Sequence, residues 1–428
     1  MAAVDVRYDE PEIRVAPPGP LARAVIAKDA AVMSPSCHRE FPLVMDRGEG
    51  VWVWDVDGNR FLDLFAGIAV SAAGHSHPAV VAAVQAQAKK FLHAGGADVY
   101  YAVMTDLAEA LARLGPGKGP NRVLFTNSGT ESIEAAVKLA RSHTARPAVI
   151  AFYGAFHGRT MGSLSLTASR SRYRRHMGPF MAEVYHAPFG DPDGVQTLLD
   201  HVVHPDDVAA IVVEPIQGEG GYRFSPDGFL PALRSIADHH GIVLIADEVQ
   251  SGLGRTGRMW AVEHWGVTPD ILVTSKGLAA GIPLGAVIAR EEIMTWPPGS
   301  HGSTSAGNPV ACAAALAILE LVEGGLMDHA ARAGKTLLDG VRDLAAKYPM
   351  LRNPRGLGLM VGVDVVDDEG RAAPTKRGAL VQALFHAGLL AIGAGNATLR
   401  FSPPLVISEH EIGAALRVMD RVFGRHKG

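Results

Sequence analysis

The chain has 428 residues, of which 48% are hydrophobic and 20% are charged, so it is long enough for a globular protein of two domains. A formal net charge of −4 without a long basic block argues against nucleic acid as a partner. Cys37 and Cys312 lack metal-binding spacing, and there is neither a signal peptide nor a run approaching the roughly 18 apolar residues of a membrane span. We therefore expect a cytoplasmic protein without a metal or a membrane segment.

Residues 1–67 are predicted to form an N-terminal arm followed by one segment of a small domain. A helical pattern covers 21–33, after a proline-rich stretch that blocks regular structure. The apolar run 51–56 predicts a strand, and an Asp-Gly turn leads from it to a partner strand over 60–64.

Residues 68–325 show apolar strand-like runs that alternate with helical patterns. Such alternation is typical of a mainly parallel sheet with helices on both faces, because parallel strands need crossover connections. We therefore expect an α/β fold in which these residues form the large domain. The predicted strands are 122–125, 148–152, 209–215, 242–246, 271–274 and 284–289, and the predicted helices include 130–143, 230–239 and 309–322.

Residues 326–428 are predicted to form a smaller α/β domain, which the N-terminal segment joins. Helical patterns here surround shorter strand-like runs, in contrast to the regular alternation before them. The predicted helices are 327–347, 376–387 and 408–423, and the predicted strands are 358–364 and 398–401.

One aspartate and one lysine stand out because each follows a buried-strand pattern. Asp247 follows the apolar run 242–246, and Lys276 follows 271–274 in a segment of small residues. The 29 residues that separate them suffice for one helical crossover between neighbouring parallel strands. A pyridoxal phosphate enzyme needs such a pair, because the amine binds the aldehyde of the cofactor and the carboxylate keeps its pyridine nitrogen protonated. We predict pyridoxal phosphate as the cofactor and Lys276 and Asp247 as the catalytic residues.

Two segments at predicted helix starts are candidates for binding the phosphate. Residues 127–131 lie between a strand and a helix, where backbone N–H groups and hydroxyls bind anions. Ser128 followed by Glu131 is equally an ordinary capping box, and both roles can coexist. Residues 301–309 form a second loop, with Pro309 at the first position of the next helix. The candidate residues are Ser128, Gly129, Thr130, Ser303 and Thr304.

Two more segments follow predicted strands, at the edge of the sheet where doubly wound folds bind ligands. In 153–160, an aromatic ring could stack on a flat cofactor and an arginine could bind a carboxylate with its planar fork. In 214–221, two glutamates lie in a glycine-rich loop, where they could equally be surface acids. The candidate residues are Phe156, His157, Arg159 and Glu219.

The segment 252–257 has the spacing GxGxxG after a strand, which offers a dinucleotide site as an alternative. However, the polar stretch 247–251 separates the strand from the glycines, whereas a dinucleotide fingerprint needs a tight strand-to-helix turn. The alternative would also leave Lys276 without a role.

Taken together, these segments resemble the class III (ω-type) aminotransferases, which are pyridoxal phosphate enzymes of fold type I. The resemblance runs from residue 41 to residue 407. It implies a large domain with a mainly parallel sheet flanked by helices, a smaller α/β domain, and active sites shared within a homodimer or a dimer of dimers. The matching stretches are 66–78, 127–141, 156–160, 214–221, 247–257, 275–286, 301–309 and 400–405.

The resemblance also implies roles for individual residues. Lys276 would hold the cofactor and move the proton between the substrate Cα and the cofactor, and Asp247 would pair with the pyridinium. Around the cofactor, the same resemblance places Gln250 at the ring hydroxyl, Val249 and Phe156 on its two faces, Ser128, Gly129 and Thr130 at the phosphate, and Thr304 at the phosphate of the second subunit.

For the substrates, the resemblance implies that Arg400 binds an α-carboxylate and that Arg159 binds a distal carboxylate. Glu219 would pair with Arg400 when a substrate lacks an α-carboxylate, because an unpaired buried charge is costly. The implied reaction moves the terminal amine of 4-aminobutyrate or a similar ω-amino acid to 2-oxoglutarate, giving glutamate and a semialdehyde. Ile68 stands where ornithine δ-aminotransferases carry a tyrosine, which argues against ornithine and leaves acetylornithine as the alternative.

Two other classes of protein remain open. A related branch racemises or epimerises amino acids, and residues 34–63 resemble that branch as well. Lys276 and Glu219 would then supply acid–base groups on the two faces of the substrate. A DNA-binding regulator built on this fold would need an added basic domain, for which the first 40 residues are too short and insufficiently basic.

Overall fold

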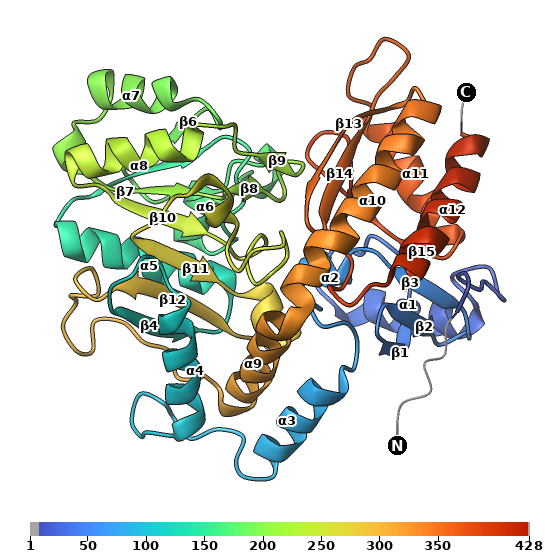
Figure 1. The fold of residues 1–428 in the computed structure, drawn as a ribbon, viewed down its shortest axis with the longest axis horizontal. Helices are drawn as coiled ribbons and strands as arrows, with labels where there is room; N and C mark the ends of the chain where they lie inside the picture. Colours follow the sequence, from blue (N-terminus) through green and yellow to red (C-terminus); the bar gives the residue numbers. More distant parts are fainter. Residues whose placement is uncertain (1–7, 427–428) are drawn as a thin grey trace. The chain divides into compact units, whose positions relative to one another are not determined.

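The computed structural model describes residues 8–426 (Figure 1). They form two compact units, one of residues 78–328 and one of the described residues before 78 and after 328. The sequence analysis divides the chain at 67/68 and 325/326. In the structure, the corresponding boundaries are later in the chain, at 77/78 and 328/329. The second one falls in the first turn of helix α10 (Met327–Lys347), where no linker composition marks it.

The larger unit is built on a sheet with the strand order β4-β12-β11-β10-β7-β5-β6. β12 runs antiparallel to both of its neighbours, and the other strands run parallel to one another. The predicted α/β class with a mainly parallel sheet is therefore confirmed. The strands are β4 (Asn121–Thr126), β5 (Ala148–Phe152), β6 (Val184–Ala187), β7 (Val208–Val213), β10 (Val243–Asp247), β11 (Ile271–Thr274) and β12 (Gly285–Arg290), and a separate pair consists of β8 (Ile216–Gln217) and β9 (Arg223–Phe224).

Alternate residues of the central strands enter two separate hydrophobic cores. In β5, Val149 and Ala151 pack with residues of α5, whereas Ile150 and Phe152 pack with residues of α7 and α8. Both faces of the sheet are covered (Figure 1), which explains why the strands are continuous apolar runs. The helices of this unit are α3 (Pro78–Ala88), α4 (Ala102–Arg113), α5 (Gly129–Thr144), α6 (Met161–Leu166), α7 (Pro192–His201), α8 (Phe229–His240) and α9 (Pro309–Leu321), with short helical turns η1 (Ser171–Tyr173), η2 (Pro205–Asp207), η3 (Ala261–Trp265), η4 (Lys276–Ala279) and η5 (Val322–Leu326).

One helical run, Pro309–Lys347, is long and apolar enough to cross a membrane, which the sequence analysis did not expect. Its apolar part is α9, in which Ala311, Ala315 and Ile318 are fully buried. α9 packs against α3 and α4 of the same unit. Its apolar composition is thus explained by burial inside the protein.

The smaller unit contains two four-stranded sheets, β1-β2-β3-β15 and β13-β14-β17-β16. Phe385 stacks on Phe61 and on Phe41, so the N-terminal and C-terminal segments share one core. The strands are β1 (Met45–Glu49), β2 (Trp52–Asp55), β3 (Arg60–Asp63), β13 (Leu351–Leu357), β14 (Met360–Val365), β15 (Leu389–Leu390), β16 (Ile392–Ala394) and β17 (Thr398–Phe401), and the helices are α1 (Pro20–Val32), α2 (Ala66–Ala69), α11 (Pro374–His386) and α12 (Glu409–Arg425).

The helical crossover expected between β10 and β11 was wrong, whereas the structure agrees with the rejection of a dinucleotide site in this segment. The crossover contains turns and the 3₁₀ turn η3 in place of a full α-helix. The glycines of 252–257 lie in these turns, and no α-helix follows them. This geometry lacks the strand–turn–helix unit that a dinucleotide site requires. Elements that the sequence analysis did not predict include β1, β6, β13, α3, α4, α6 and α7.

Candidate active site

Lys276 and Asp247 lie at the carboxyl ends of neighbouring strands. β10 ends at Asp247, which is opposite Val273 of the parallel strand β11. Lys276 begins η4 just after β11, with φ of 29°, a conformation that residues with side chains seldom adopt. The preceding Ser275 donates a hydrogen bond from Oγ to the carbonyl of Leu284 at 2.7 Å, which closes the connection to β12.

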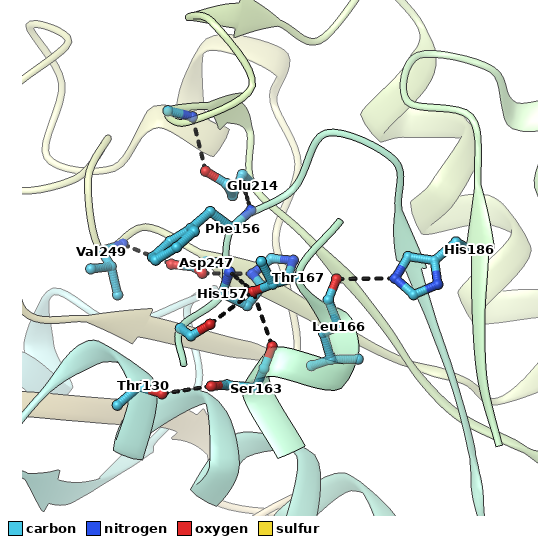
Figure 2. A network of polar contacts seen from close by, with 12 residues as sticks. Thr130, Phe156, His157, Ser163, Leu166, Thr167, His186, Glu214, Asp247 and Val249 are labelled. Atoms are coloured by element: carbon cyan, nitrogen blue, oxygen red, sulfur yellow. Dashed lines mark hydrogen bonds and ion pairs between the residues drawn. The ribbon is translucent and has the colours of Figure 1, made fainter. Parts of the chain in front are cut away.

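Asp247 is buried and forms a hydrogen bond with the fully buried ring of His157 (Figure 2). The distance from Asp247 Oδ2 to His157 Nδ1 is 2.7 Å, and Asp247 Oδ1 accepts the N–H of Val249 at 3.1 Å. Burial lowers the pKa of His157, but the hydrogen bond and the charge of Asp247 outweigh it, so that this pKa is raised overall. The structure thus brings together three of the predicted cofactor residues.

Glu214, which the sequence analysis left as a possible surface acid, is buried beside these groups. Its Oε1 accepts the N–H of Phe156 at 2.8 Å, and its Oε2 accepts the N–H of Gly218 at 2.9 Å. Burial raises the pKa of Glu214 to about 7, although the charge of His157 lowers it. Glu214 therefore holds together the two loops that follow β5 and β7, and no feature of the sequence other than its place at a strand end pointed to this role.

Several features around Asp247 fit pyridoxal phosphate. Gln250 Oε1 and His157 Nε2 are buried and have no hydrogen-bond partner among the described residues, so they are able to bind an added polar group. A Cβ on Gly129 would come within 2.9 Å of Val249 Cγ1, which means that only glycine fits between the start of α5 and this loop. The buried carboxylate, the available polar atoms and the helix start suit a pyridine ring with a phosphate.

The two predicted phosphate segments also meet. Asn127 Nδ2 donates to Ser303 Oγ at 2.9 Å, which joins the segment before α5 to the loop 301–309. Ser128 is the N-cap of α5 and accepts the N–H of Glu131 at 3.4 Å. The carboxylate of Glu131 binds Asn127 and not Ser128, so only half of the predicted capping box forms. Thr304 is exposed in the single chain.

The hydroxyl of Thr130 belongs to a cluster that the sequence analysis missed. Thr130 Oγ1 lies 2.6 Å from Ser163 Oγ and 2.8 Å from Thr160 Oγ1. Glu134 Oε1 accepts hydrogen bonds from Thr160 Oγ1 at 2.6 Å and from the N–H of Ser163 at 3.0 Å. This cluster connects the start of α5 with α6 and with the segment that carries Arg159; Figure 2 includes Thr130 and Ser163.

The remaining predicted residues are distributed over both units. Arg159 is exposed and Glu219 is half-buried, and both lie in the larger unit. Ile68 (φ of 68°) lies in α2, and Arg400 lies in β17 with an exposed fraction of 2%; both belong to the smaller unit. The pairing of Glu219 with Arg400 therefore stays a prediction.

A comparison with protein families assigns the chain. Residues 33–423 match the family model described as aminotransferase class-III. The chain belongs to the class III aminotransferases. Among its relatives, an acetylornithine aminotransferase of Methanopyrus kandleri is 46% identical over 382 residues, covering 89% of this chain and 94% of that protein. The 4-aminobutyrate aminotransferase of Escherichia coli K12 is 39% identical over 402 residues, covering 90% of this chain and 94% of that protein.

Solved structures of other aminotransferases share the fold. An ornithine aminotransferase from Toxoplasma gondii ME49 superimposes with a TM-score of 0.87 at 32% identity, covering 95% of both chains. An amine transaminase from an uncultivated Pseudomonas species, solved with pyridoxal phosphate bound, gives a TM-score of 0.84 at 32% identity, covering 93% of this chain and 98% of that one. The predicted family, fold type I and dependence on pyridoxal phosphate are confirmed.

Proposed function

We propose that this class III aminotransferase moves the terminal amine of 4-aminobutyrate, or of a similar ω-amino acid, to 2-oxoglutarate. The observation that carries the proposal is Arg159, an exposed guanidinium beside Phe156 that has no carboxylate partner among the described residues. Such a group suits the carboxylate that both 4-aminobutyrate and 2-oxoglutarate carry away from the reacting carbon. The 4-aminobutyrate aminotransferases among the relatives support this choice.

The proposed chemistry assigns a role to each buried group. Pyridoxal phosphate supplies the aldehyde that takes up the amine and the ring that withdraws electrons. The Lys276 amine would hold the cofactor and move the proton at the substrate carbon that bears the amine, and Asp247, fixed by His157, would keep the pyridine nitrogen protonated. Further proposed contacts are Gln250 at the ring hydroxyl, Val249 and Phe156 at the ring faces, and Ser128, Gly129, Thr130 and Ser303 at the phosphate.

The proposal extends to a gate and to a dimer. Arg400 would bind the α-carboxylate of 2-oxoglutarate, and Glu219 would pair with Arg400 while 4-aminobutyrate reacts. One site could then accept both substrates without leaving a buried arginine unpaired. Thr304 would reach the phosphate of a second subunit, in a homodimer or a dimer of dimers; its exposure in the single chain is compatible with this role.

N-acetylornithine is the second candidate donor, because the relative from Methanopyrus kandleri is named for that substrate. Ornithine itself is the weaker choice, since Ile68 replaces the tyrosine of ornithine δ-aminotransferases. Both candidate donors carry a carboxylate at the end away from the terminal amine, and N-acetylornithine differs by one additional carbon, which bears an acetamido group next to that carboxylate.

A paired assay tests the proposal. The purified enzyme with bound cofactor is incubated with 4-aminobutyrate, N-acetylornithine, ornithine, lysine or simple L-amino acids, with and without 2-oxoglutarate. We expect glutamate to form with 4-aminobutyrate and only when the keto acid is present. If glutamate forms with N-acetylornithine and 2-oxoglutarate but not with 4-aminobutyrate and 2-oxoglutarate, N-acetylornithine is the donor. Loss of optical rotation without any keto acid would identify a racemase and overturn the proposal.

A further inference from the structure

Two arginines that are 13 residues apart in the chain lie against the ring of Tyr173. The guanidinium carbon of Arg159, in the loop after β5, is 4.5 Å from the centre of this ring, and that of Arg172, in η1, is 5.2 Å from it. The Tyr173 ring meets Phe156 edge-on, with 5.9 Å between centroids and an angle of 77°. Tyr173 therefore links both guanidiniums to an aromatic side chain proposed to contact the cofactor.

The charges in this cluster are unbalanced. Among the described residues, neither Arg159 nor Arg172 forms an ion pair or a hydrogen bond with a carboxylate. The segment 169–178 contains four arginines and no acidic residue. Two cations near one ring repel each other, and an anion bound to either guanidinium would relieve the repulsion. The cation–π contacts hold the guanidiniums without using their N–H groups, which remain available to a carboxylate.

We propose that Arg172 is a second carboxylate-binding arginine, that Tyr173 positions it together with Arg159, and that the pair selects substrates with a carboxylate far from the reacting carbon. This inference rests on the proposed function, in which Arg159 receives the distal carboxylate. It adds a residue outside the motifs of the family resemblance. In this proposal, Arg159, Arg172 and Tyr173 together produce the preference for a dicarboxylate keto acid, whereas the proposed function attributes it to Arg159 alone.

The test compares two keto acids that differ in the distal carboxylate, 2-oxoglutarate and pyruvate. Arg172→Ala should raise KM for 2-oxoglutarate about fivefold, the size expected for a partly exposed ion pair, and should change KM for pyruvate by less than about twofold. Arg175→Ala is the matched control, because Arg175 is exposed in the same segment and bonds only to His176 among the described residues. Equal effects of the two substitutions, or equal effects on the two keto acids, would overturn the proposal.

Tyr173 provides an independent measurement. Tyr173→Phe keeps the ring and should retain the ratio of the two KM values, whereas Tyr173→Ala should shift this ratio in the same direction as Arg172→Ala. A purely structural role of Tyr173 would instead change kcat with both keto acids alike, and this result would remove the positioning role.

The wild-type enzyme separates the failure of this inference from the failure of the proposed function. No preference for 2-oxoglutarate over pyruvate in the wild type would overturn the proposed acceptor, and the role of Arg172 with it. A clear preference that Arg172→Ala leaves intact would overturn the role of Arg172 alone.

Discussion

The buried and the exposed sides of the candidate site are built in different ways. On the buried side, Asp247 and Glu214 each accept hydrogen bonds through both carboxylate oxygens, and so does Glu248, the buried residue that follows Asp247 in the chain. On the exposed side, Arg159 and Arg172 lie against aromatic rings and have no carboxylate partner among the described residues. Buried polar groups are costly to change, whereas exposed ones change at little cost to stability. Under the proposed function, the buried hydrogen bonds would fix the common chemistry and the exposed arginines would govern substrate choice.

The largest effect is expected on the buried side, at Lys276. Lys276→Ala removes the amine that is proposed to hold the cofactor and to move the proton, so steady-state turnover should be lost while the protein still folds. Turnover, the visible absorption band of the bound cofactor and circular dichroism measure these outcomes together. Retained turnover in a folded variant would refute the assignment of Lys276.

Substitution of a buried arginine should raise KM for 2-oxoglutarate more than substitution of an exposed one. Arg400 is 2% exposed, and Arg400→Ala should raise KM for 2-oxoglutarate roughly 100-fold, far more than Arg172→Ala does. KM for 4-aminobutyrate, which lacks an α-carboxylate, should change much less. Equal changes for both substrates in initial-rate measurements would remove the proposed pairing with Glu219.

The pH dependence of the free energy of unfolding tests the buried side through a residue that has no proposed catalytic role. Glu248 accepts hydrogen bonds from Ser251 Oγ at 2.5 Å and from the N–H of Val262 at 2.8 Å, and burial raises its pKa from 4.5 to about 7. Between these values the folded state keeps a proton that the unfolded state releases, so the free energy of unfolding falls as the pH rises through this window.

Glu248→Gln should reduce this fall by about 3 kcal/mol at most, because an amide does not titrate, can accept the N–H of Val262 and can donate to Ser251 Oγ, while the contribution of Glu214 remains. Urea unfolding at pH 4.5 and pH 8 measures the difference. Glu109→Gln, at an exposed position of α4, is the control and should leave the pH dependence unchanged. A Glu248→Gln variant with the wild-type pH dependence would contradict the account.

The smallest change in function is expected on substitution of Glu134, whose carboxylate binds Thr160 and Ser163. Glu134→Ala removes the acceptor for Thr160 and Ser163, and should weaken cofactor retention about fivefold, as for one or two lost hydrogen bonds. Glu134→Gln keeps an acceptor oxygen and should behave like the wild type. The rate of cofactor release under dialysis distinguishes the two variants. Similar losses in both would show that the charge of Glu134, and not its acceptor oxygen, retains the cofactor.

Local patterns predicted the elements that have a clear periodicity or an apolar run. β5, β11 and α10 begin and end at the predicted residues, because apolar runs or helical periodicity mark them. The antiparallel direction of β12 was not predictable, since a buried strand reads the same in either direction. β6 was missed because its residues 184–186 are only half-buried and include a histidine.

For the candidate site, the sequence identified residues by type and by place at a strand end, but not their environment. Asp247 was selected on both grounds, and the structure adds its bond to His157. Glu214 and Glu134 were not selected, because their roles depend on partners 58 and 26 residues away in the chain. Long-range hydrogen bonds of this kind leave no periodic trace in a sequence.

The connection from β11 to β12 has a consequence for how such enzymes diversify. Lys276 lies within residues 275–284, which join two adjacent antiparallel strands and are closed by the Ser275–Leu284 hydrogen bond. An insertion there would displace the lysine or shift the register of β12, where a Cβ on Gly285 would come within 2.4 Å of Thr126 and Ser132. Insertions and deletions that create new substrate ranges are therefore expected in surface segments such as 169–176, while the length of the lysine connection stays constant.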